Sequence, residues 1–218
     1  MEQVAPANSL RERLIDAGVD LVMTEGSASL GLREIARRAG VSHGAPRRYF
    51  PTHHALLSAI ARRGFTELAA RFAAAAEGAR TPREQLRGLA DAFLDYAGEH
   101  GGMFELMFRH DLLDSEAHAS DAEAPGLPRL RESTLPLFAR LVGLVAQDRA
   151  HHSANGTGPS YDSAPPPALT AAALWTNLHG IAVLRASGSL QLAFPGTSEG
   201  PDPLVTAVLD AHLGRVDA

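Results

Sequence analysis

Residues 30–57 read LGLREIARRAGVSHGAPRRYFPTHHALL, and the rest of the chain is organised around this stretch. Its first half predicts a short helix, because four apolar residues share one stripe at i, i+3, i+4 and i+7: Leu32, Ile35, Ala36 and Ala39. Arginines and one glutamate fall on the other side. Gly40 predicts the end of this helix, since glycine adopts the left-handed backbone conformation without steric cost. We expect Val41 to turn back over the stripe.

The second half of the stretch predicts another short helix, from about His43 to Phe50. Ser42 is a good N-cap for it. His43 and Arg47 share one face of this helix, which we expect to be exposed, while Pro46 and Phe50 share a face that we expect to be buried. Two short helices joined by a glycine turn, with cationic side chains and bare backbone exposed on the second, are typical of a helix-turn-helix that enters the major groove of DNA.

The composition excludes several classes of enzyme. The chain has 218 residues, of which 45% are hydrophobic, and no cysteine, so disulfides, thiolate nucleophiles and cysteine zinc sites are ruled out. All 20 basic residues are arginine, which excludes a P-loop lysine and a Schiff-base lysine. The motifs G-x-S-x-G and H-E-x-x-H are missing, and the pairs His53-His54 and His151-His152 lack metal-ligand spacing. We therefore expect no catalytic residue, no metal site and no cofactor.

The charge is divided unevenly along the chain. Residues 1–65 hold nine arginines against six acidic residues, whereas the remainder holds eleven against nineteen. Residues 30–57 alone hold five arginines and one glutamate, which is the local footprint expected where a polyanion docks. We find no signal sequence and no apolar run of the ~20 residues that a membrane span needs, so we expect a cytoplasmic protein without a membrane partner.

Apolar periodicity predicts helices through the rest of the chain. Ser9-x-x-Glu12 opens the first as a capping box, and Thr81-Pro82-x-Glu84 opens another. The Gly101-Gly102 pair predicts a helix break. The expected helices are residues 10–26, 53–77, 82–100, 103–108, 127–150 with a kink near Pro136, 169–187 and 204–216. The expected loops are residues 110–126, 151–167 and 188–202.

The order of these elements resembles the TetR family of bacterial transcriptional repressors, with residues 10–57 carrying the close match. A weaker match, Trp175-x-x-x-His179-Gly180, is similar to the Trp-His-Gly signature of one C-terminal subclass. The resemblance implies an all-α protein with a three-helix helix-turn-helix DNA-binding domain, residues 1–52, and a helical ligand-binding and dimerisation domain, residues 53–218. It also implies a homodimer on a palindrome in double-stranded DNA and a small-molecule effector that releases it.

The resemblance assigns DNA-binding roles residue by residue. Side chains at positions that usually meet phosphates are Arg33, Arg37, Ser42, Tyr49, Thr52 and His53, and positions that face base edges are His43, Gly44, Arg47 and Arg48. Two of them depart from the family pattern. Arg47 replaces the usual aromatic residue and is able to read guanine bidentately. His53 replaces the usual lysine and is largely neutral at pH 7, so we expect its phosphate contact to be weak or pH-dependent.

Residues 86–185 contain the groups expected to meet the effector. Apolar walls are predicted from Phe93, Tyr96, Phe104, Met107, Phe108 and Trp175, and polar groups from Arg109, Asn177 and His179. The same residues also suit an ordinary core, and Trp175 and His179 also suit a dimer interface. An effector-independent helical DNA-binding protein is therefore the alternative, and the volume inside this core distinguishes the two. We expect the dimer to form through residues 169–187 and 204–216.

Overall fold

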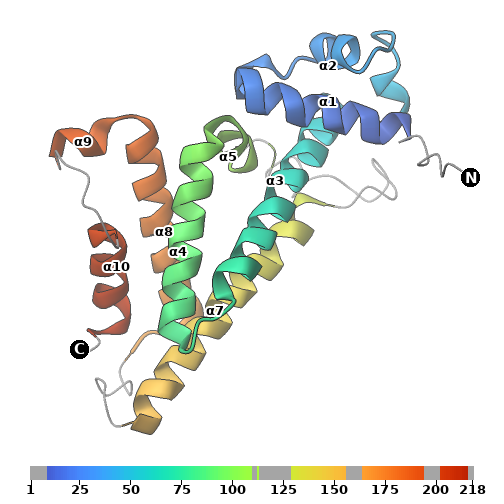
Figure 1. Cartoon of the computed structure of the whole chain (residues 1–218). Helices are drawn as coiled ribbons and strands as arrows, with labels where there is room; N and C mark the ends of the chain where they lie inside the picture. The colour runs from blue at the N-terminus through green and yellow to red at the C-terminus, as the bar shows by residue number, and fades with distance from the viewer. Residues whose placement is uncertain (1–8, 110–111, 113–128, 156–163, 194–201, 216–218) are drawn as a thin grey trace, which may run out of the picture. The chain divides into compact units, whose positions relative to one another are not determined.

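The computed structural model describes residues 9–109, 112, 129–155, 164–193 and 202–215. These ranges are helical, without a strand, so the predicted all-α class is confirmed (Figure 1). The elements are α1 (Leu10–Glu25), η1 (Ser27–Ser29), α2 (Leu32–Arg38), η2 (Pro46–Arg48), α3 (His53–Ala76), α4 (Pro82–Glu99), α5 (Gly101–Met107), α7 (Leu130–Asn155), α8 (Pro167–Ala186), α9 (Ser189–Ala193) and α10 (Pro203–Leu213). The predicted loop 110–126 lies, apart from Leu112, outside the described residues.

The chain forms two compact units. The first contains residues 1–66 and 100–133, and the second contains residues 67–99 and 134–218. The helix α3 therefore begins in the first unit and ends in the second, and the chain returns between α4 and α5. The predicted domain boundary after residue 52 is a functional division and stays a prediction.

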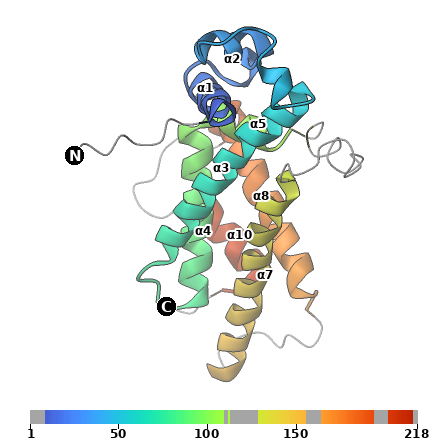
Figure 2. The ribbon, with the colours of Figure 1, turned by 90° about the vertical axis from the view of Figure 1, so that its right-hand side faces the viewer.

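The first unit is built on α1, which supports α2 and the start of α3 (Figures 1 and 2). Ser9 caps α1 as predicted, with its Oγ accepting a hydrogen bond from the Glu12 amide at 3.3 Å. The helices meet at Gly18, where a Cβ would lie 2.3 Å from Cδ1 of Ile60 and 3.9 Å from Cδ1 of Ile35. A side chain at this position would force the Ile60 side chain to move, so the glycine permits the close approach.

The end of α2 confirms the predicted glycine turn. Gly40 has φ +68°, and the amides of Gly40 and Val41 donate to the carbonyls of Arg37 at 3.1 Å and Ala36 at 3.0 Å. These two bonds make a Schellman motif, which satisfies carbonyls that the helix leaves open. Nη2 of Arg13 adds a bond to the carbonyl of Ala39 at 2.7 Å and so ties this turn to α1.

The predicted break is present, because α4 ends at Glu99, but the two glycines begin the next helix, α5, which was expected to start at residue 103. A Cβ at Gly102 would lie 2.7 Å from the carbonyl oxygen of Val22 in α1. Ser27 donates to Glu105 at 2.6 Å beside this contact. The second glycine is therefore explained by the close packing of α5 on the end of α1, which a sequence pattern does not reveal.

In the second unit, α4 packs on α8, and α10 packs on both. The capping box at the start of α4 is confirmed, since the Glu84 amide donates to Thr81 Oγ1 at 3.1 Å and the Thr81 amide donates to Glu84 at 3.2 Å. Arg83 then joins three helices. Its guanidinium bonds the buried Asp148 of α7 at 3.1 Å and the carbonyl of Leu213 at the end of α10 at 2.9 Å.

Three expectations for the second unit are wrong. The predicted loop 151–167 begins as helix, because α7 continues to Asn155, where His152 is buried and its Nδ1 bonds the carbonyl of Asp148 at 2.8 Å. The predicted loop 188–202 contains α9. The expectation that the chain has no apolar run long enough for a membrane span is also wrong, because α8 is 20 residues long and contains an 18-residue window with a mean hydropathy of 1.2, so by length and composition it is apolar enough to cross a membrane. One such helix is weak support for a membrane, because core helices pass the same test.

We predict that Gly18→Ala lowers the free energy of unfolding by about 1–3 kcal/mol, the usual cost of forcing extra atoms into a packed core. Gly143→Ala is the matched control, because a Cβ at this glycine inside α7 meets nothing within 4 Å. That control should be neutral or stabilise by up to about 1 kcal/mol through helix propensity. Urea unfolding followed by circular dichroism measures both, and equal effects would contradict the close approach at Gly18.

Candidate nucleic-acid interface and effector cavity

The predicted recognition helix, residues 43–50, is shorter than expected. The structure has a turn at residues 43–45 followed by the 3-10 helix η2. Pro46 has no amide hydrogen, so it cannot donate to the carbonyl of Ser42, which accepts from the amide of Ala45 at 3.0 Å. Gly44 further weakens a regular helix here. The segment expected to read DNA is therefore a tight turn rather than a regular helix.

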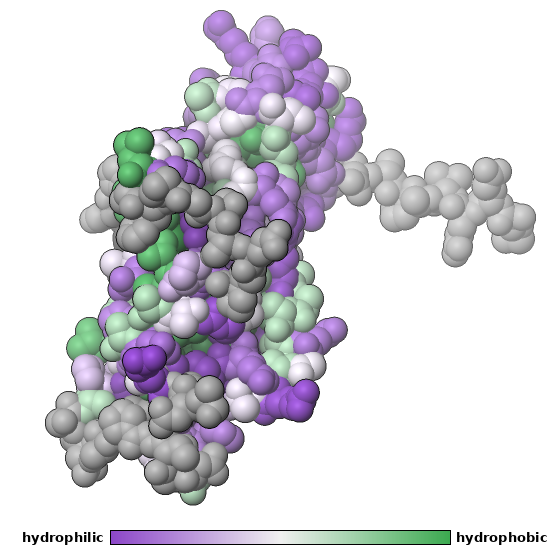
Figure 3. All heavy atoms as spheres, turned by 60° about the vertical axis from the view of Figure 1, so that its left-hand side comes forward, coloured by the Kyte–Doolittle hydropathy of each residue, from purple (hydrophilic) through white to green (hydrophobic). Residues whose placement is uncertain are grey.

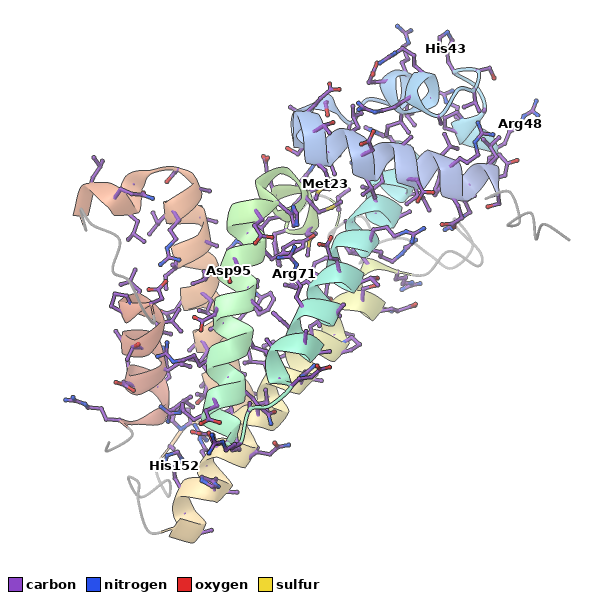
Figure 4. All side chains as sticks on the ribbon, in the orientation of Figure 1. Met23, His43, Arg48, Arg71, Asp95 and His152 are labelled. Carbon is purple, nitrogen blue, oxygen red and sulfur yellow. The ribbon has the colours of Figure 1, made fainter. Side chains whose placement is uncertain are left out.

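The two faces of this turn are arranged as the sequence predicts. Pro46 and Phe50 are buried, and the Phe50 amide donates to the carbonyl of Pro46 at 2.9 Å. The guanidinium of Arg11 lies 5.4 Å from the centre of the Phe50 ring and ties the turn to α1. The exposed side chains and backbone are those of Ser42, His43, Gly44, Arg47, Arg48, Tyr49 and Thr52. Figure 4 shows His43 and Arg48 extending away from the ribbon.

Of the five arginines of residues 30–57, two form ion pairs with acidic residues and three do not, within the described residues. Nε of Arg38 bonds Asp20 at 2.7 Å and its Nη1 bonds Glu25 at 2.8 Å, so this residue holds α2 on α1. Arg37 is exposed and bonded to Glu34, and this bond lowers the pKa of the Glu34 carboxyl. Within the described residues, no ion pair involves Arg33, Arg47 or Arg48. These three carry the free positive charge of the face.

The N-terminus of α3 adds a polar edge to the same segment. Oγ1 of Thr52 accepts from the amide of Ala55 at 3.0 Å, which leaves its hydroxyl hydrogen available to a phosphate. Nε2 of His53 lies 2.6 Å from the carbonyl oxygen of Leu30, so this nitrogen is the donor. A phosphate contact by His53 therefore has to use Nδ1, and it stays a prediction.

The predicted effector residues fall in both compact units. Phe104, Met107 and Phe108 belong to α5 and its end in the first unit, where the Phe108 ring centre lies 5.5 Å from that of Phe65. Met103 and Met107 pack so closely on α3 that a Cβ at Gly64 would lie 2.5 Å from the Met107 sulfur. Arg109 follows α5, with its amide donating to the carbonyl of Leu106 at 3.3 Å.

The second unit contains a small cavity of about 20 Å³ among α3, α4, α7 and α8. Its wall consists of nine apolar residues: Phe72, Leu86, Leu89, Ala90, Phe93, Leu137, Leu141, Trp175 and Leu178. The ring centres of Phe93 and Trp175 are 5.0 Å apart across it. This volume holds about one water molecule, whereas ligand pockets usually measure ~300–1,000 Å³. Among these nine residues the core is nearly filled.

Of the predicted effector residues, Phe93 and Trp175 line the cavity. The other wall residues belong to ordinary apolar stripes, and periodicity does not distinguish a wall from a solid core. Asn177 is exposed, and its Nδ2 donates to the carbonyl of Ala173 at 2.8 Å and lies 3.2 Å from Nε2 of His212.

Two further predicted effector residues lie on the packed faces of α4 and α8. His179 is half-buried, and burial lowers the pKa of its imidazole, which favours the neutral form at pH 7. The fully buried ring of Tyr96 lies 5.1 Å below the guanidinium of Arg71, and burial raises the pKa of its hydroxyl. An effector role for either residue stays a prediction.

Two family profiles match the sequence. Residues 14–60 match the profile of bacterial regulatory proteins of the tetR family, and residues 86–212 match that of the tetracyclin repressor-like C-terminal domain. The second match by itself covers more than half of the chain.

Two characterised regulators are similar to parts of the chain. The HTH-type transcriptional regulator BetI of Rhizobium meliloti (strain 1021) is 35% identical over 79 residues, which are 36% of this chain and 39% of that protein. The HTH-type transcriptional activator FasR of Mycolicibacterium smegmatis (strain ATCC 700084 / mc(2)155) is 27% identical over 141 residues, which are 65% of this chain and 64% of that protein. The matches thus span less than two thirds of the length of each relative.

Solved structures resemble the whole chain. A protein of unknown function from Rhodococcus sp. RHA1 is 29% identical, with a TM-score of 0.68, and 97% of each chain is covered. A TetR-like transcriptional regulator from the same organism is 20% identical, with a TM-score of 0.60, and the likeness covers 97% of this chain and 100% of that one. At this lower identity the likeness shows the fold alone.

We predict that Arg47→Ala relaxes base preference at one position of each half-site and costs about 1–3 kcal/mol there, because it removes a bidentate contact to a base edge. Tyr49→Phe is the comparison, and it should weaken binding to all sequences alike through a lost phosphate contact. Binding to variant and random duplexes at fixed salt measures both. Equal losses on specific and random DNA for Arg47→Ala would assign this side chain to phosphate.

Proposed function

Because the chain belongs to the tetR family of bacterial regulatory proteins, it is a DNA-binding transcriptional regulator rather than an enzyme, and we propose that it is a dimeric, ligand-responsive repressor. The observation that carries the DNA-binding part is the exposed turn at η2, with Arg33, Arg47 and Arg48 free of ion pairs among the described residues. As a regulator of transcription it acts in the cytoplasm, where the chromosome lies. The subclass with the Trp-His-Gly signature stays part of the proposal.

The proposed target is a palindrome in double-stranded DNA. Two copies related by a two-fold axis present two identical turns, so each turn meets one half-site of the same sequence. The turn supplies arginine and histidine to base edges, while Thr52 and the start of α3 supply donors to phosphates. We infer repression from the family resemblance. Activation is the other possible outcome, since the relative FasR is named an activator.

The proposed effector is apolar or amphipathic. Every residue that lines the cavity of the second unit is apolar, so the buried part of an effector has to be hydrocarbon or aromatic. Because the cavity measures about 20 Å³, such a molecule enters only when α3, α4, α7 and α8 move apart. The alternative, an effector-independent DNA-binding protein, is favoured by the same small volume.

The proposed coupling between the cavity and the DNA-binding turn runs along two continuous stretches of chain. Phe72 of the cavity wall and Ile60 beside Gly18 both lie on α3. Phe93 lies on α4, which leads through His100 into α5, and α5 packs against the carbonyl of Val22 in α1. A ligand that displaces the wall therefore displaces helices that support the reading turn. A change of a few ångströms in the separation of the two turns is enough to lose a site whose half-sites are about 34 Å apart.

We expect the purified protein to retain a small set of palindromic fragments from its own genome, with steep salt dependence. With about 6 to 10 phosphate contacts per dimer, affinity should fall about 10³- to 10⁵-fold between 50 and 200 mM salt. Sequencing of the retained fragments and titration of one of them test the claim. Unselective retention, or affinity that does not change with salt, would contradict DNA recognition by η2.

We predict that an uncharged aromatic or alkyl compound quenches or shifts the fluorescence of Trp175, the only tryptophan, and lowers operator affinity. Leu141→Phe should abolish both effects while operator binding persists, because the larger ring fills the cavity. Leu135→Phe, at a side chain of α7 that is 60% exposed, is the matched control and should change neither. Operator release that survives Leu141→Phe would place the effector elsewhere, and a compound panel without any response would favour the effector-independent alternative.

A further inference from the structure

Arg37 is an exposed cation of the DNA-binding head whose donors are already occupied. Its side chain is 71% exposed. Its Nε donates to Oε2 of Glu34 at 2.9 Å, and its Nη2 donates to Oε1 of the same carboxylate. A guanidinium grips a phosphate with the same two parallel bonds. The Glu34 carboxylate therefore occupies the donors that a DNA phosphate would use.

The pair between Glu34 and Arg37 differs from the other ion pairs of α2. Arg38 bonds Asp20 and Glu25, which both belong to α1, so its pairs join two helices. The pair of Arg37 lies within α2 and joins no second element. Neither of its two residues makes another hydrogen bond or ion pair with a described residue. The packing of α2 on α1 therefore does not depend on this pair.

Glu34 is the only acidic residue of residues 30–57, the stretch with the basic footprint. In Figure 3 the surface formed by α1 and α2, at the top, is largely hydrophilic. An acid in the first turn of α2 and a base in its last turn suit the helix dipole, which gives Glu34 a structural role. Exposed pairs contribute little stability, however, and a negative charge on a surface that meets a polyanion opposes binding.

We propose that Glu34 is a specificity-determining residue, because it competes with DNA phosphates for the guanidinium of Arg37. This inference rests on the proposed phosphate contact of Arg37. On random DNA the carboxylate keeps the guanidinium. On the operator, contacts between the turn and the bases fix the register of the head, so one phosphate is held beside α2 and Arg37 exchanges its partner.

The consequence is a lower affinity for DNA of the wrong sequence. Non-specific binding comes almost entirely from neutralised phosphates, so a cation that is paired in the free protein is lost mainly from that mode. The specific complex also has the base contacts of the turn, and it loses proportionally less. Glu34 thereby raises the ratio of operator affinity to random-DNA affinity.

Glu34→Gln tests the competition on a short fluorescein-labelled duplex of random sequence, followed by anisotropy between 50 and 200 mM salt. The variant keeps the size and helix propensity of the side chain. It should bind about 10-fold more tightly at the lowest salt, with a salt slope steeper by roughly 0.9 for each head. Asp20→Asn is the matched control, because it removes the same charge while Glu25 still holds Arg38. It should change affinity by less than about 2-fold.

Two further measurements assign the effect to Arg37 and to specificity. Combining Glu34→Gln with Arg37→Gln should return the affinity and the salt slope to those of the unmodified protein, because the freed cation is removed again. On a fragment retained from its own genome, Glu34→Gln should gain less than on the random duplex, so the specificity ratio should fall.

The outcomes separate the competition from the DNA contact on which it rests. The competition is overturned if Glu34→Gln binds random DNA no better than Asp20→Asn does, or more weakly than the unmodified protein, since Glu34 then only supports the helix. A gain that persists in the double variant overturns it as well, because Glu34 then acts through its own charge. An unmodified protein that binds neither duplex would overturn the proposed DNA contact itself.

Discussion

The close approach of three helices at Gly18 is the constraint on which the DNA-binding head depends. The helix α2 has seven residues and η2 has three, and segments this short do not hold their shape in water without tertiary packing. Their orientation therefore comes from α1 and α3, which meet where Gly18 leaves space for Ile60. Once that contact is made, Phe50 and Pro46 fill the remaining apolar surface, and the outer side of the turn is exposed as a consequence.

Within the DNA-binding head, two of the arginines form ion pairs with acidic residues, so their positive charge is less available to DNA. Arg38 and Arg37 face acidic partners of their own unit, and exposed pairs of this kind contribute little stability. The Arg38 pairs connect α2 to α1, the Arg37 pair lies within α2, and both reduce the number of free cations. Of the five arginines of residues 30–57, those without an acidic partner among the described residues are Arg33, Arg47 and Arg48, so the count of basic residues in the sequence overstates the electrostatic attraction.

Sequence periodicity predicted the helices and their buried faces, because both follow from a repeated spacing of apolar residues. The helix ends at Ser9, Gly40 and Thr81 followed from local backbone chemistry, and the burial of Pro46 and Phe50 followed from which face they share. Single residues that act through tertiary contact were not predictable. From the sequence, Gly102 predicts only a helix break, whereas in the structure it lies against the carbonyl of Val22, where a side chain would clash. The cavity between Phe93 and Trp175 was foreseen only as a set of apolar residues, because the spacing of a wall and that of a solid core are the same.

The small size of that cavity constrains any account of regulation. If the closed core is the form that binds DNA, a ligand binds only the fraction of molecules in which α4 and α8 have separated, and its apparent affinity is reduced by that fraction. In the proposed coupling, this separation also displaces α5 and α3 in the first unit. The cost of opening and the regulatory coupling would then come from one deformation, and a ligand would release the operator only as far as it binds the open form more tightly than the closed one. A core that opened without cost would bind ligands well, but the closed, DNA-binding form would then be less populated.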